Sequence, residues 1–149
     1  MFNWITVVCT GNICRSPFGE AVLKRLLPQK IIVSAGLITE QSNLVGVEAD
    51  KLAQSLAKEL GYSLKKHKAQ QLSIELCQKS DLILIMEEWQ KARIVKLYPK
   101  CREKIMLFSH WKGEECIPDP FQKKEEVFKS CFNSILNGSK SWAEKLKFS

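Results

Sequence analysis

A cysteine and an arginine six positions apart, Cys9 and Arg15, have the residue types and spacing best suited to chemistry in this chain. They lie in the segment Cys-Thr-Gly-Asn-Ile-Cys-Arg-Ser-Pro, residues 9–17, which follows the apolar run Ile5-Thr6-Val7-Val8 and precedes a helical pattern. A strand, a tight loop and a helix N-terminus in that order direct backbone N–H groups and the helix dipole toward a bound anion. Such a field favours the thiolate form of a cysteine, which is the nucleophilic form. The segment therefore predicts phosphoryl transfer through Cys9.

The residues of this loop suit the binding of phosphate. Gly11 and Asn12 tolerate the left-handed backbone that a tight loop needs. Ser16 suits a helix N-cap, and Pro17 suits the first helical turn. Of the six cysteines, only Cys9 has an arginine six residues later. We expect the phosphoryl oxygens to be bound by the consecutive residues Thr10, Gly11, Asn12, Ile13, Cys14, Arg15 and Ser16.

Transfer of a phosphoryl group from a phenol also needs a clamp for the phosphoryl oxygens and an acid for the leaving oxygen. Arg15 can be the clamp, because a guanidinium group binds two oxygens in fork geometry. Three aspartates are candidates for the acid. Asp81 begins a strand and Asp50 lies in or beside a helix, whereas Asp119 stands between two prolines that exclude strand and helix. This rigid loop can present a carboxyl group to the site, so Asp119 is the predicted general acid.

Three further side chains lie in or near this constellation. The Ser16 hydroxyl can donate to the Cys9 sulfur and ease its departure when water attacks a phosphocysteine. Cys14 is either a small buried hydrophobe or a redox partner of Cys9, and the residues alone leave both interpretations open. His67 sits among lysines, where an exposed position is the simpler expectation.

The composition is that of a soluble globular protein. With 149 residues, 45% of them hydrophobic and 26% charged, the chain predicts a single domain over 1–149. The longest apolar run, Leu82–Met86, is too short to span a bilayer, so we expect no membrane insertion. The net charge of +7 is spread over helix faces, with one short basic run at 65–68. This pattern predicts no nucleic-acid binding and a mild attraction for anionic substrates.

The cysteine and histidine content also limits the chemistry. Six cysteines occur without a Cys-x-x-Cys pair, and there are only two histidines. A structural zinc site is therefore not expected. The simplest interpretation is that the thiols are reduced and that the protein is cytoplasmic.

Short apolar runs and helical patterns alternate along the chain, which predicts an open α/β sandwich with right-handed crossovers. The runs are rich in Ile, Val and Leu, as in parallel strands covered on both faces: Trp4–Cys9, Ile31–Ala35, Leu82–Met86 and Ile105–Phe108. The predicted helices run from the loop to Pro28, then over Val47–Leu60, Gln70–Gln78 and Glu88–Leu97, and finally from Val127 to Leu146 with Gly138 as a candidate break.

Ligands of such sheets bind beyond the carboxyl ends of the strands. The Cys9 loop stands at the end of the first predicted strand, which is where this rule places a site. The loop that begins at Gly36 and the segment after Phe108 can reach the same rim. We therefore expect the site to be built from segments that are distant in sequence.

With these motifs, the chain resembles the low-molecular-weight protein tyrosine phosphatases over nearly its whole length. The resemblance rests on the segments Val8–Pro17, Ser34–Gly36, Ser80–Leu84 and Asp119-Pro120. Three further segments resemble the branch found in bacterial capsule and exopolysaccharide systems: Leu44–Gly46, Met106–Trp111 and Cys116–Pro120.

The resemblance implies an α/β three-layer sandwich with a four-stranded parallel sheet flanked by helices, and a reaction without metal or cofactor. It implies that Cys9 attacks phosphorus to form a phosphocysteine while Asp119 protonates the phenol. Asp119 then helps water to hydrolyse this intermediate. The implied substrate is a phosphotyrosine protein, for this branch a bacterial tyrosine autokinase of polysaccharide export. We expect the enzyme to be a monomer.

The resemblance also implies roles for residues around the loop. It implies a hydrogen-bond network that holds the loop in place, made by Asn12, Ser16, Ser34 and His67. Cys14 matches a position that can form a protective disulfide with Cys9 under oxidation. Leu44 and Phe121 are expected to form walls for the substrate ring.

Particular residues bear on three other functions: hydrolysis of phosphoarginine, thiol-dependent reduction of arsenate and passive binding of phosphate. Phe121 stands where the family commonly has tyrosine, and phenylalanine there is shared with the related protein arginine phosphatases. Those enzymes carry threonine where this chain has Ile13, so Ile13 favours phosphotyrosine. Thiol-dependent arsenate reduction needs further cysteines close together downstream, but Cys77 and Cys101 are far apart in the sequence. A passive phosphate-binding module would not need a nucleophile, a clamp and an acid together.

Overall fold

The computed structural model describes residues 2–113 and 116–149, and a four-stranded, all-parallel sheet lies at its centre. The strands follow the order β2-β1-β3-β4 across the sheet. Their bounds are β1 Trp4–Cys9, β2 Ile31–Gly36, β3 Leu82–Ile85 and β4 Ile105–Leu107. The four predicted strands are confirmed, with C-terminal ends that differ by one residue in three of them.

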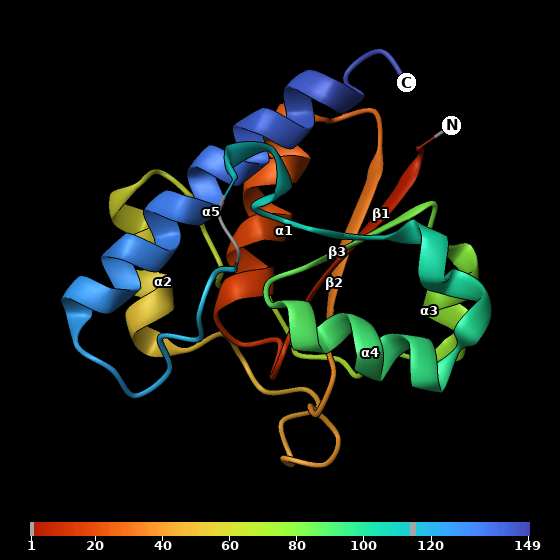
Figure 1. Cartoon of the computed structure of the whole chain (residues 1–149). Helices are drawn as coiled ribbons and strands as arrows, with labels where there is room; N and C mark the ends of the chain where they lie inside the picture. Colours follow the sequence, from red (N-terminus) through yellow and green to blue (C-terminus); the bar gives the residue numbers. More distant parts are fainter. Residues whose placement is uncertain (1, 114–115) are drawn as a thin grey trace.

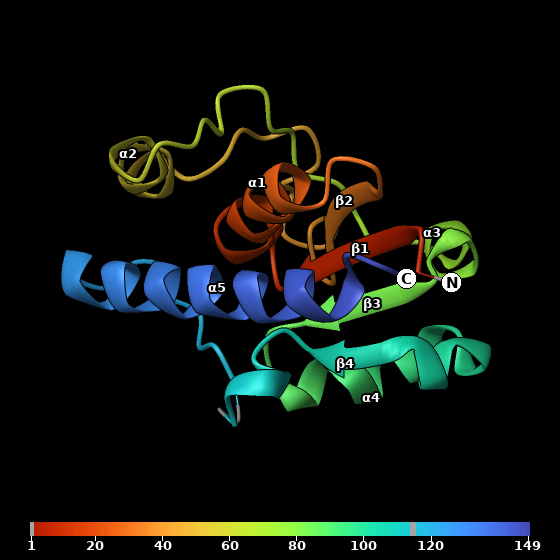
Figure 2. The same cartoon turned by 90° about the horizontal axis from the view of Figure 1, so that it is seen from above.

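Helices cover both faces of the sheet (Figures 1 and 2). On one face pack α1 Arg15–Leu26, α2 Lys51–Glu59 and α5 Glu125–Leu146. On the other face pack α3 Ile74–Lys79 and α4 Glu88–Leu97, with the 3-10 helix η1 Pro99–Lys104 beside them. A second 3-10 helix, η2 His110–Lys112, follows β4. The predicted α/β three-layer sandwich is confirmed.

Strand β1 shows why both faces must be covered. Ile5 and Val7 belong to the core on the α1 and α5 side, and Val8 belongs to the core on the α3 and α4 side. All three side chains are 0% exposed. Successive side chains of a strand point to opposite faces, so an unbroken apolar run needs helices on both.

Two helices begin later than the periodicity predicted. Helix α2 begins at Lys51 because the Asp50 carboxylate accepts hydrogen bonds from the backbone N–H groups of Leu52 and Ala53. Helix α3 begins at Ile74, and the prediction of a helix from Gln70 was wrong. Residues 70–72 instead run alongside Gly36, which donates to the Gln70 carbonyl and accepts from Leu72 N–H.

The candidate break at Gly138 was also wrong, because α5 is continuous through it. A Cβ atom at this position would lie 2.8 Å from Cδ1 and 2.9 Å from the carbonyl oxygen of Phe108. Phe108 follows β4 directly and is fully buried. The glycine is therefore a packing residue that lets α5 approach the end of β4.

We expect Gly138→Ala to destabilise the fold by about 1–3 kcal/mol, because the overlap with the Phe108 backbone exceeds the gain in helix propensity. Urea denaturation followed by circular dichroism measures the change. Asn137→Ala is the matched control, since this neighbouring side chain is exposed. Equal or greater stability of Gly138→Ala would contradict the packing role.

Candidate active site

The loop between β1 and α1 is shaped by its own backbone and by β2. Asn12 adopts the expected left-handed conformation, with φ of 62°. Gly11 does not have a positive φ, so that part of the prediction was wrong. Gly36, at the end of β2, allows the close approach of the loop. A Cβ atom there would lie 2.8 Å from the carbonyl carbon of Gly11 and 2.9 Å from the backbone nitrogen of Asn12.

A pocket of about 420 Å³ opens over this loop. Its lining combines the predicted nucleophile, clamp and acid with apolar walls: Cys9, Thr10, Gly11, Ile13, Cys14, Arg15, Ile38, Ser42, Leu44, Asp119 and Phe121. Asn12 and Ser16 are fully buried and do not line it. The structure therefore brings together residues from the first loop, from the loop after β2 and from the segment before α5.

Ser16 acts inside the loop and does not cap α1. The N-cap residue is Cys14, which makes no side-chain capping bond, so the predicted capping role of Ser16 was wrong. Ser16 Oγ lies 2.9 Å from Cys9 Sγ and accepts a hydrogen bond of 2.8 Å from Asn12 Nδ2. Because Asn12 occupies one lone pair of the oxygen, the Ser16 hydroxyl hydrogen can be directed at the Cys9 sulfur.

Asn12 is the centre of a buried hydrogen-bond network. Its Nδ2 donates to Ser34 Oγ at 2.9 Å, its Oδ1 accepts from Gln70 N–H at 2.9 Å, and its carbonyl accepts from His67 Nε2 at 2.6 Å. The structure thus places Ser34 and His67 against the loop, where the resemblance expected them. Gln70 was missed, because its periodicity indicated a helix.

The guanidinium group of Arg15 is held on several sides, and the residue is 1% exposed. Nη1 donates to Glu87 Oε1 at 2.6 Å and to the carbonyl of Ile117 at 2.8 Å. Nη2 donates to Thr10 Oγ1 at 2.9 Å and lies 3.6 Å from Asp119 Oδ2. These contacts fix the direction in which the clamp faces before any ligand binds.

The charges around Arg15 keep it protonated in spite of its burial. Burial by itself lowers the pKa of this guanidinium group, but the charges of Cys9 and Asp119 and the hydrogen bond of Glu87 outweigh it and raise the pKa. Glu87 was missed in the sequence. The available signal was its position two residues after β3, at the sheet edge where ligands bind.

Asp119 is the aspartate that reaches the pocket. Its Oδ1 accepts from the backbone N–H of Phe121 at 3.0 Å, which turns Oδ2 toward Arg15. Asp50 caps α2, and Asp81 accepts from backbone N–H groups at the start of β1. The half-exposed Phe121 stands at the pocket wall, as Leu44 does.

The six cysteines are free thiols in different environments. Burial, together with neighbouring Cys131 and Cys9, raises the pKa of the Cys14 thiol well above its usual value. Cys77 and Cys101 are neighbours although they are distant in sequence, and burial, together with Cys101, raises the pKa of Cys77 to about 12. Both belong to the core on the α3 and α4 side of the sheet, whereas Cys9 belongs to the other core, so they form no relay with it.

Within the described ranges, 2–113 and 116–149, no three His, Cys, Asp or Glu side chains gather closely enough to hold a metal ion. None of the helices there is both long enough and apolar enough to cross a bilayer.

The parallel sheet and the pocket define an α/β protein with a thiol, a guanidinium group and a carboxylate around one hollow at the carboxyl end of β1. The chain belongs to the low-molecular-weight phosphotyrosine protein phosphatase family, whose model matches residues 4–149. The predicted resemblance and enzyme class, a low-molecular-weight protein-tyrosine phosphatase, are confirmed.

Three of the similar proteins match this chain over almost its whole length. The protein-tyrosine phosphatase Wzb of Escherichia coli K12 is 44% identical over 98% of this chain and 97% of its own length. The structure of Vibrio vulnificus Wzb in complex with benzylphosphonate is 44% identical, with a TM-score of 0.96 over 98% of this chain and all of that chain. The YwlE arginine phosphatase of Geobacillus stearothermophilus is 29% identical, with a TM-score of 0.87 over 99% of this chain and 94% of that chain.

Proposed function

We propose that this phosphatase hydrolyses phosphotyrosine through a phosphocysteine intermediate, with Cys9 as nucleophile, Arg15 as clamp and Asp119 as acid and base. The observation that carries the proposal is the single pocket lined by these three residues. The benzylphosphonate complex of Vibrio vulnificus Wzb supports it, because that ligand joins an aromatic ring to a phosphate-like group.

In the first step, the Cys9 thiolate attacks phosphorus and the bond from phosphorus to the phenolic oxygen breaks. Asp119 transfers its proton to this oxygen, so that a neutral phenol leaves. The loop N–H groups and Arg15 bind the phosphoryl oxygens on which charge is spread in the transition state. Nη1 of Arg15 is occupied by Glu87 and Ile117, which leaves Nε and one N–H of Nη2 for the phosphoryl group.

In the second step, water attacks the phosphorus of the phosphocysteine and Asp119 accepts a proton from the water. The sulfur–phosphorus bond breaks, inorganic phosphate is formed and Cys9 leaves as a thiolate. The Ser16 hydroxyl, 2.9 Å from Cys9 Sγ, stabilises this leaving sulfur by donating to it. The network of Asn12 and its partners holds the loop through both steps.

The walls of the pocket fit an aromatic substrate. Ile13, Leu44 and Phe121 line it with apolar surface beside the thiol. The segments that resemble the capsule and exopolysaccharide branch support a bacterial tyrosine autokinase of polysaccharide export as the substrate. The proposal includes a cytoplasmic, monomeric enzyme without a cofactor. In this enzyme Cys14 protects Cys9 from irreversible oxidation: a peroxide oxidises the Cys9 thiolate to a sulfenic acid, and the Cys14 thiol then displaces water from it to form a reducible disulfide.

A protein arginine phosphatase is the second candidate, because Phe121 is shared with that class and the YwlE arginine phosphatase has the same fold. We expect kcat/KM for a phosphotyrosine peptide to exceed that for the matched phosphoarginine peptide by at least about tenfold, since Ile13 offers no hydroxyl to a phosphoguanidinium group. Phosphate release from both peptides by the wild type measures this ratio.

Two variants serve this comparison. Cys9→Ser is the control for contaminating phosphatases, and Ile13→Thr is expected to shift the ratio toward phosphoarginine. Faster release from phosphoarginine by the wild type would replace tyrosine by arginine as the substrate while leaving the nucleophile and clamp in place.

A further inference from the structure

We propose that the Thr10 hydroxyl is an additional phosphate-binding group, oriented by the buried amide of Gln90. The inference rests on the proposed function, because it concerns how the same pocket holds the phosphoryl group. The Thr10 hydroxyl would bind phosphate in addition to the backbone N–H groups of the loop, because its two hydrogen-bonded neighbours leave its hydrogen free.

Gln90 has a fixed orientation. It is fully buried in the first turn of α4. Its Oε1 accepts from the backbone N–H groups of Met86 at 2.9 Å and of Glu87 at 3.1 Å. Because only the carbonyl oxygen of the amide can accept, these two bonds distinguish the Gln90 oxygen from its nitrogen. The amide nitrogen must therefore face Thr10, and Nε2 lies 3.3 Å from Thr10 Oγ1.

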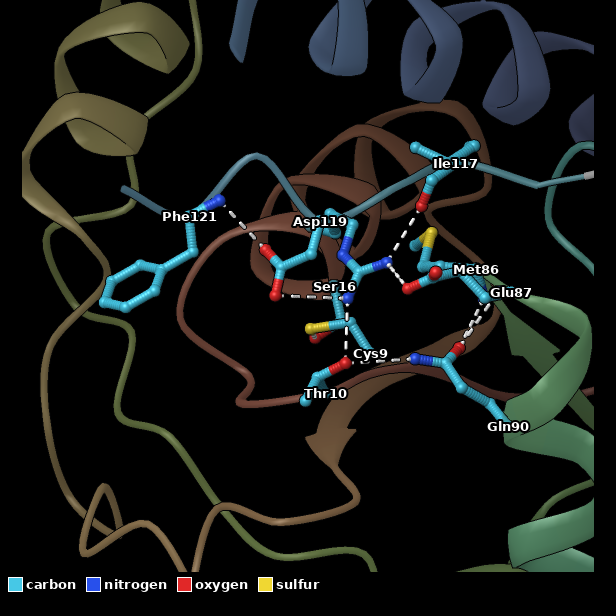
Figure 3. Close-up of polar contacts among 10 residues, drawn as sticks. Cys9, Thr10, Ser16, Met86, Glu87, Gln90, Ile117, Asp119 and Phe121 are labelled. Carbon is cyan, nitrogen blue, oxygen red and sulfur yellow. Dashed lines mark hydrogen bonds and ion pairs between the residues drawn. The ribbon is translucent and has the colours of Figure 1, made fainter. Parts of the chain in front are cut away.

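Thr10 Oγ1 thus lies between two donors (Figure 3). Gln90 Nε2 donates to it from one side and Arg15 Nη2 from the other. A hydroxyl oxygen has two lone pairs and one hydrogen, and neither of these nitrogens can accept a hydrogen bond. Both lone pairs are occupied, so the hydrogen must point elsewhere. No residue in the described part of the chain accepts it.

The free hydrogen belongs to Thr10, one of the residues that line the pocket. An oxygen of a phosphate ester or of inorganic phosphate is the acceptor that the pocket is built to receive, because Cys9 and Arg15 line it too. A hydrogen bond from a neutral donor to such an anion is stronger than one between neutral groups. Thr10 also holds Nη2 of Arg15, so its hydroxyl both binds phosphate and positions the clamp.

The test compares Thr10→Val with Thr10→Ser. The probe is inorganic phosphate, measured as a competitive inhibitor of aryl phosphate hydrolysis. We expect Thr10→Val to raise the inhibition constant about tenfold and Thr10→Ser to remain within about twofold of the wild type. The loss in kcat/KM should be equal for good and poor leaving groups, because Thr10 acts on the phosphoryl group and not on the phenol.

Thr6→Val is the matched control. Thr6 lies in β1, four residues before Thr10, is fully buried and shares a hydrogen bond of 2.6 Å with Ser80 away from the pocket. It should lower the melting temperature without changing the inhibition constant. An unchanged inhibition constant in Thr10→Val, or an equal rise in Thr10→Ser, would overturn the inference. Either outcome would overturn the role of Thr10 alone. Failure of the proposed function would appear in a different measurement, as turnover by Cys9→Ser near the wild-type rate.

Discussion

Cys9→Ser is expected to lower the turnover of aryl phosphates by at least about 10⁴-fold while phosphate binding persists. A serine hydroxyl is not ionised at neutral pH. The side chain that contacts the Cys9 sulfur is Ser16, which is itself bonded to Asn12, and neither of these two side chains is a base. Arg15 and the loop N–H groups remain to bind the anion.

The measurement joins steady-state kinetics with calorimetric titration of inorganic phosphate into the same preparation. In the wild type, acid quenching during turnover of an aryl phosphate should trap a phosphorylated protein that the variant lacks. Cys77→Ala is the control, because it removes a buried thiol on the other side of the sheet. Turnover of Cys9→Ser near the wild-type rate would show that another group attacks phosphorus.

The parts of the fold that could be predicted are those set by neighbouring residues. A buried parallel strand is a local apolar run, so the strands were located to within one residue. The start of α3 and the role of Gly138 depend on distant partners. Residues 70–72 are held by Gly36, and Gly138 is required by Phe108. Periodicity carries no information about such partners.

The same distinction applies to the site. The loop from Cys9 to Ser16 is one continuous segment, and the prolines on both sides of Asp119 marked that residue in the sequence. Glu87 lies 72 residues from Arg15, and Gln90 lies 80 residues from Thr10, so their contacts exist only after β1 and β3 pair. Both follow β3 at the edge of the sheet where β1 ends. Cys9 could therefore be predicted from the local sequence. Glu87 and Gln90 could not, because the order of the strands brings them to the loop.

Asp119→Ala is expected to slow the hydrolysis of phenyl phosphate by about 10²–10⁴-fold and to affect a dinitrophenyl ester far less. An ordinary phenol, with a pKa of about 10, leaves slowly as an anion and needs the proton. A dinitrophenol is far more acidic and leaves unaided. The measured quantity is kcat/KM across a series of substituted aryl phosphates, because it reports the formation of the phosphocysteine and excludes its hydrolysis.

Asp50→Asn is the matched control, since asparagine also caps a helix and Asp50 lies at the start of α2. It should leave the dependence on the leaving group unchanged. In Asp119→Ala, kcat/KM should fall steeply as the leaving phenol becomes less acidic, whereas the wild type should show a shallow slope. An equal loss for every ester would remove Asp119 from proton transfer and leave it only as an electrostatic partner of Arg15, 3.6 Å away. A steep slope would place the proton donor on the proline-flanked loop, where the bond from the Phe121 N–H to Oδ1 holds the Asp119 carboxyl group in the pocket.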